Sequence, residues 1–130
     1  MKRTILLISV ISVFAAVCSA QDDAAYPGYM KAINASNRPL RMAIMAKDTA
    51  AAAAEATKMA AAFDSVAAYW KAKKDDAAMQ MAITARDAAK TIAASTDSDA
   101  QNAALTTMAG TCNACHMVHR GGGPGAFVIK

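Results

Sequence analysis

The residues of this chain that are best suited to chemistry lie close together near its C-terminal end. Cys112, Cys115 and His116 form the pattern C-x-x-C-H, which is the attachment signature of c-type haem. On a helix, residues three apart point to the same side, so both thiols can reach the vinyl groups on one porphyrin edge. His116 follows directly and can approach the iron from that side. The motif therefore predicts one haem c, attached through two thioethers, with His116 as an iron ligand.

Three other uses of these residues fit the sequence less well. A thioredoxin-like redox pair would begin a helix, where the helix dipole lowers a thiol pKa, but this pair lies near the end of a helical pattern. A zinc site made of Cys112, Cys115, His116 and His119 would crowd four ligands onto two helical turns. A disulfide between Cys112 and Cys115 would close a very short loop and strain the helix.

Residues 1–20 have the three-part pattern of a secretory signal peptide. Lys2 and Arg3 precede an apolar run from Ile5 to Val17, and small residues follow up to Ala20. The run is too short for a comfortable transmembrane helix. We therefore expect cleavage after Ala20 and export to the periplasm.

Cys18 lies inside this segment and has one alternative use. A lipoprotein signal would keep it as an acylated anchor, but Val17 is larger than the residue such signals carry before the cysteine. Removal of the segment leaves Cys112 and Cys115 as the only cysteines of the mature chain. An even number of cysteines suits an oxidising compartment.

Length, charge and composition exclude several classes of protein. The 130 residues, less a signal peptide, suffice for one domain. Loss of Lys2 and Arg3 lowers the net charge from +4 to about +2, too little for a nucleic-acid binder. No stretch after the signal approaches the roughly 20 apolar residues that a bilayer requires, so no stable membrane insertion is expected. No hydrolase motif is present, and we expect no enzyme.

Helix start and stop signals divide the mature chain into four stretches of similar length. The first runs from about Pro27 to Lys47, and Pro39 is expected to kink it or split it near Asn37. The other three run from the N-cap Thr49 to about Lys71, from Asp75 or Asp76 to about Ser95, and from Asp97 or Ser98 to the glycines that begin at Gly121.

Apolar residues recur at spacings of three and four along each stretch and predict its core side. They are Met30, Ile33, Leu40 and Ile44; Met59, Phe63, Val66 and Trp70; Ala78, Met81, Ala85, Ala88 and Ile92; and Leu105, Met108, Cys112 and Cys115. Four such helices joined by short connections predict an all-α fold, an antiparallel up-down-up-down four-helix bundle over residues 21–120. Because many core residues are Ala or Met, we expect the covalently attached haem to fill the centre. Residues 121–130 are expected to form a Gly-rich flexible tail, loose from Ala126 onward.

The chain resembles the class II c-type cytochromes, the family of cytochromes c prime and the low-spin cytochromes c556. In that family the haem motif lies on the fourth helix of a bundle and is typically followed by Arg four residues after the ligating His, where Arg120 stands here. The resemblance spans about Tyr26 to Arg120 and is specific at Cys112, Cys115, His116 and Arg120. His119 stands where the family often has an aromatic residue.

The resemblance implies two functions that differ in the sixth position of the iron. A Met sulfur there gives a low-spin electron carrier, and Met30 stands about where c556-like relatives place that ligand; Met42 and Met45 are the fallbacks. A vacant site implies a five-coordinate cytochrome c prime that binds NO or CO. A third hypothesis is a haem-storing or sensor module.

The expected partners are redox proteins, and the resemblance is compatible with a homodimer through the first two helices. Arg120 is expected either to pair with a haem propionate or to act as a helix-end cation. His119 is expected to point along the haem edge or into solvent. Met59, Met81 and Met108 are expected to fill gaps in the core.

Overall fold

The computed structural model describes residues 18–123 and 128–130. The predicted signal peptide lies outside this range except for residues 18–20. These three residues belong to the first turn of a helix, and nothing in the structure tests cleavage after Ala20.

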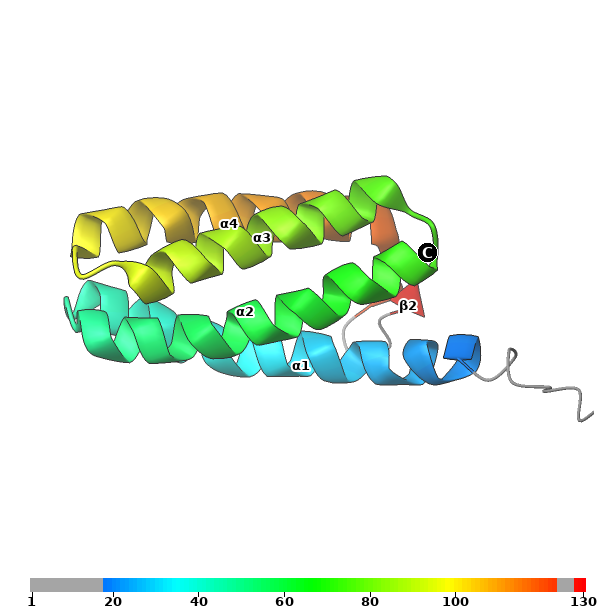
Figure 1. The fold of residues 1–130 in the computed structure, drawn as a ribbon, viewed down its shortest axis with the longest axis horizontal. Helices are drawn as coiled ribbons and strands as arrows, with labels where there is room; N and C mark the ends of the chain where they lie inside the picture. Colours follow the sequence, from blue (N-terminus) through cyan, green and yellow to red (C-terminus); the bar gives the residue numbers. More distant parts are fainter. Residues whose placement is uncertain (1–17, 124–127) are drawn as a thin grey trace, which may run out of the picture.

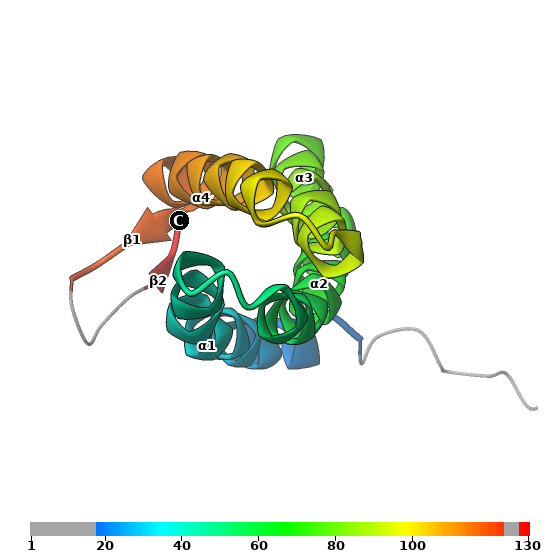
Figure 2. The ribbon, with the colours of Figure 1, turned by 90° about the vertical axis from the view of Figure 1, so that its left-hand side faces the viewer.

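Four helices follow one another through the described chain and lie side by side as a bundle (Figure 1). They are α1 (Cys18–Met45), α2 (Thr49–Ala72), α3 (Asp76–Ala94) and α4 (Ser98–His119). The helices pack in chain order, α1 on α2, α2 on α3 and α3 on α4 (Figure 2), whereas α1 and α4 touch only sparsely. The prediction of an all-α, up-down four-helix bundle is confirmed.

Aspartates begin three of the four helices. Asp48, Asp75 and Asp97 precede α2, α3 and α4, and each carboxylate accepts a hydrogen bond from a backbone N–H in the first helical turn. The negative charge also suits the positive end of the helix dipole. The prediction of Thr49 as the N-cap of α2 is therefore wrong by one residue.

Helix α1 is longer and less interrupted than the sequence predicted. It begins at Cys18 rather than near Pro27, and both Pro27 and Pro39 lie inside it. The expected split near Asn37 is wrong, because the helix continues through it. Pro39 and the residue four positions earlier, Ala35, are both exposed, so water can reach the carbonyl that loses its helical hydrogen bond.

The predicted core sides of the helices are largely confirmed. Leu40, Met59, Ile92 and Met108 are each at most 2 % exposed. Met30 and Cys112 are half-buried and pack against this core, and Met81 is half-buried as well. The prediction that Met81 is a core residue is wrong, because its side chain lines a shallow groove between α3 and α4.

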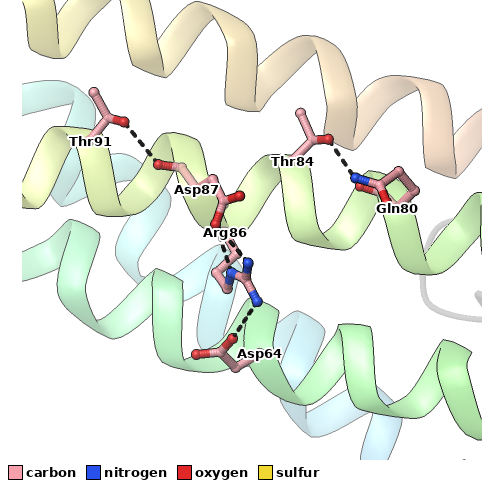
Figure 3. Close-up of polar contacts among 6 residues, drawn as sticks. All are labelled: Asp64, Gln80, Thr84, Arg86, Asp87 and Thr91. Atoms are coloured by element: carbon pink, nitrogen blue, oxygen red, sulfur yellow. Dashed lines mark hydrogen bonds and ion pairs between the residues drawn. The ribbon is translucent and has the colours of Figure 1, made fainter.

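A polar network joins α2 and α3 on their outer side (Figure 3). The Arg86 guanidinium donates to Asp87 at 2.8 Å and to Asp64 of α2 at 3.2 Å. The hydroxyls of Thr84 and Thr91 donate to backbone carbonyls one turn earlier in α3. Solvent reaches these groups and screens the ion pairs of Arg86, so we assign the network little weight in stability.

The described end of the chain folds back onto α4. Arg120–Gly121 (β1) pairs antiparallel with Val128–Ile129 (β2), and the backbone N–H of Lys130 donates to the His119 carbonyl at 2.8 Å. A side chain at Gly121 would place Cβ 2.9 Å from Cγ of Lys130. The prediction of a loose tail is therefore wrong for residues 128–130; residues 124–127 lie outside the described range.

Gln101 links α4 to α2 and α3 at the end of the bundle opposite residues 119–123. Its side chain is fully buried, and Nε2 lies 3.0–3.1 Å from the carbonyl oxygens of Thr49, Ile92 and Ser95. The first turn of α4 is thereby tied to the start of α2 and the end of α3.

Replacement of Gln101 by Met should destabilise the bundle, because a side chain of similar size would remove the buried amide that donates to these carbonyls. We expect the free energy of unfolding to fall by about 1–3 kcal/mol, measured by urea denaturation followed by circular dichroism. The control is Asn102→Met at the exposed neighbouring position, with an expected change within about 0.5 kcal/mol. Equal effects of the two substitutions would contradict the assigned role of Gln101.

Candidate functional site

The C-x-x-C-H residues lie in the last two turns of α4. Cys112 and Cys115 are free thiols and both are half-buried, and Cys112 packs against the hydrophobic core. His116 is half-buried as well. The two thiols continue the seam formed by Leu105 and Met108, so the motif faces inward at one end of the bundle.

Burial raises the pKa of both thiols. The Cys112 pKa rises mainly through desolvation and further through the nearby Cys115, and the Cys115 pKa rises through desolvation and the negative charge of Asp75. A reactive redox pair requires the opposite shift, which a helix N-terminus or a nearby cation supplies. The pair is therefore poorly suited to thiol–disulfide exchange.

The environment of His116 favours a neutral imidazole. Desolvation and, secondarily, the positive charge of Arg120 lower the His116 pKa. A neutral imidazole offers a nitrogen lone pair to a metal. Arg120 also holds the end of α4, because its backbone N–H donates to the His116 carbonyl.

An aromatic cluster surrounds the motif end of the bundle. The indole N–H of Trp70 in α2 donates to the Tyr26 hydroxyl of α1 at 3.3 Å, and the rings of Tyr69 and Trp70 both lie edge or tilted against that of Tyr26. The hydroxyl of Tyr69 donates to Asp23 at 2.9 Å. The start of α1 and the end of α2 therefore meet beside the motif.

Tyr26 connects this cluster to the thiols. Burial raises the pKa of Tyr26 to about 12, and the proximity of Cys115 adds to the rise while the hydrogen bond from Trp70 opposes it. Tyr26 of α1 and Cys115 of α4 are therefore electrostatic neighbours although the two helices touch at few points.

His119 lies inside the bundle end rather than in solvent. Its side chain is 13 % exposed and Nε2 lies 3.8 Å from Oδ2 of Asp75. Its ring lies 4.6 Å from that of Trp70, centroid to centroid. The solvent-facing alternative stated for His119 is wrong, because the ring is part of the aromatic cluster.

The three methionines considered as iron ligands lie in different surroundings. Met30 is half-buried, packs against the core, and lies one turn after Tyr26 on the same side of α1. Met42 and Met45 are 58 % and 83 % exposed in the last turn of α1, at the end of the bundle opposite the motif (Figure 1). Only Met30 combines burial with a place near the motif end.

The donor set suits a haem better than a bare metal ion. Within residues 18–123 and 128–130, no three His, Cys, Asp or Glu side chains come together as a metal site, which disfavours the four-ligand zinc alternative. Two thiols, a neutral imidazole and a half-buried thioether are the groups that c-type haem uses.

Sequence reasoning missed Tyr26, Asp75 and the inward position of His119 as parts of this site. A signal for Tyr26 was present, because it precedes Met30 by four residues and extends the apolar stripe of α1 by one turn. His119 likewise continues the seam of α4, four residues after Cys115. No sequence spacing links Asp75 to α4, since their contact depends on how the helices pack.

Removal of the Tyr26 hydroxyl should change how stability depends on pH. Above pH 10 the unfolded chain releases this proton first, whereas the folded chain holds it to about pH 12, so the wild type loses stability across this interval. Between about pH 9 and pH 12, the free energy of unfolding of Tyr26→Phe should fall by about 2 kcal/mol less than that of the wild type. Urea denaturation at each pH measures this difference. A loss in Tyr26→Phe equal to that of the wild type would contradict the assignment.

Along the described part of the chain, every helix is too short or too polar to cross a bilayer. No family model, curated protein or solved structure matches this chain. The evidence for function is therefore the motif and the surroundings in which the bundle places it.

Proposed function

We propose that this protein is a periplasmic monohaem c-type cytochrome that carries one electron between redox partner proteins. The observation that carries the proposal is the position of the C-x-x-C-H residues, which are half-buried on the inner side of the last helix of a four-helix bundle.

Each residue of the motif has a distinct role in the proposal. Cys112 and Cys115 would form the two thioethers, and His116 would provide an imidazole nitrogen to the iron. Haem supplies a one-electron couple at its iron when bound. Met30 would offer a thioether sulfur from α1, and Arg120 would provide a cation suited to a haem propionate.

The surrounding side chains provide an apolar, water-excluding environment. Tyr26 and Trp70 are 8 % and 4 % exposed, and Ile33, two turns further along α1, is 9 % exposed. A low-dielectric surrounding disfavours a change of net charge and so influences the reduction potential. A buried group with one exposed edge can exchange electrons through a small, transient interface.

We further propose membership of the class II c-type cytochromes, on the four-helix architecture and the motif on the fourth helix. Export through the predicted signal peptide supplies the oxidising compartment. The protein then has no substrate of its own and no catalytic residue, and a homodimer through α1 and α2 remains compatible with the proposal.

Covalent attachment is tested by expression with a c-type cytochrome maturation system. We expect intact-protein mass spectrometry to show the mature chain plus one haem, retained after acid and organic extraction. Cys112→Ala with Cys115→Ala should abolish attachment, because both thioethers are lost. The control Thr111→Ala, adjacent to the motif, should leave it unchanged. A wild-type chain without the added mass would refute the proposal.

Replacement of Met30 tests the sixth ligand and separates the two cytochrome functions. We expect the ferrous wild type to show the sharp, split visible bands of a low-spin haem, and Met30→Ala to show broad bands with new binding of CO. The control is Met42→Ala, an exposed methionine of the same helix, which should keep the wild-type spectrum. Broad bands in the wild type itself would instead support the five-coordinate, gas-binding cytochrome c prime.

A further inference from the structure

We propose that His119 is a positioning residue, which clamps the last turn of α4 to the turn between α2 and α3 and thereby sets the orientation of the His116 imidazole. The inference rests on the proposed function, because it concerns the residue proposed to ligate the iron. The C-x-x-C-H motif and its spacing indicate no such role for His119.

The contacts of His119 are those of an anchored residue. Its ring lies 4.6 Å from the Trp70 ring at an interplanar angle of 45°, and its Nε2 lies 3.8 Å from Oδ2 of Asp75. Its backbone carbonyl accepts the N–H of Lys130. A histidine in the last turn of a helix usually faces solvent, where its cation suits the helix dipole. Here, by contrast, the side chain is mostly buried and contacts Trp70 and Asp75, while the backbone carbonyl is held by Lys130.

Trp70 and Asp75, the two residues that contact the His119 side chain, are linked to each other. The backbone N–H of Asp75 donates to the Trp70 carbonyl at 3.1 Å, and Lys74 between them adopts a left-handed conformation with φ of 59°. Oδ1 of Asp75 caps α3 through the N–H of Ala78 at 2.9 Å, which leaves Oδ2 toward His119. Since Asp75 is fixed by the cap, it can act as a stationary partner.

The contacts of His119 affect His116 because both residues lie in the last turn of α4. The last carbonyls of a helix lack helical partners, and terminal turns fray. His116 lies three residues before the helix ends at His119, so its backbone belongs to the terminal turn. A contact that holds His119 also holds the backbone that carries His116. For a ligating imidazole, the orientation of the ring tunes the metal.

The experiment uses the haem-loaded, oxidised protein and the proton NMR spectrum of its haem methyl groups. In a low-spin ferric haem the spread and order of these paramagnetically shifted resonances depend on the orientation of the axial ligands. We expect His119→Gln to change their order or compress their spread, because the imidazole of His116 loses its fixed orientation. The matched control is Met117→Gln in the same turn, where the side chain is 82 % exposed, and its spectrum should match the wild type.

Three further variants separate the contacts. His119→Phe keeps an aromatic ring against Trp70 and should restore most of the wild-type pattern. Trp70→Ala removes the opposing ring and should reproduce the effect of His119→Gln. Asp75→Asn keeps a good helix cap but removes the charge opposite His119, and should give a smaller change in the same direction.

The outcomes distinguish a positioning role from a merely structural one. A lower melting temperature of His119→Gln with an unchanged methyl pattern would overturn the inference and leave the proposed function intact. A wild type without attached haem would refute both, and its absorption spectrum would reveal this before any variant was made.

Discussion

Trp70 joins three of the four helices at the end of the bundle that carries the C-x-x-C-H motif. From α2 its indole donates to Tyr26 of α1 and its ring lies against His119 of α4. Because α1 and α4 touch each other sparsely, these side-chain contacts supply much of what holds the two helices at this end. At the opposite end, the Gln101 amide ties α4 to the start of α2 and the end of α3. The arrangement holds both ends of the bundle while leaving the edge between α1 and α4 loosely packed.

Burial determines the chemical state of the motif. Desolvation disfavours charge, so it raises the thiol pKa values and lowers that of His116. The same residues at the N-terminus of an exposed helix would be favoured as thiolates. The C-terminal position on α4 therefore lacks the helix N-terminus that would favour thiolates at Cys112 and Cys115. The nearby aspartate and arginine act in the same directions as burial.

Periodicity predicted the helices and their inner sides well, and predicted their ends poorly. Phe63, Val66 and Trp70 are buried as their spacing requires. Pro39 was overestimated as a breaker, since water can satisfy the carbonyl that an exposed proline leaves free. The pairing of Val128–Ile129 with Arg120–Gly121 follows from no local pattern, because a two-residue strand has too few residues to show one. Both errors concern hydration or long-range pairing rather than helix propensity.

The sequence by itself determined the four-helix architecture and the spacing of Cys112, Cys115 and His116, because helical periodicity and i, i+3 geometry are local properties of the chain. Only the tertiary structure decided that Met30 is half-buried while Met42 and Met45 are exposed, and that His119 faces Trp70 and Asp75. Residues 75 and 119 are distant in sequence and come together only through the packing of α2 and α3 against α4. Their contact depends on the relative rotation and height of whole helices, which no local spacing encodes.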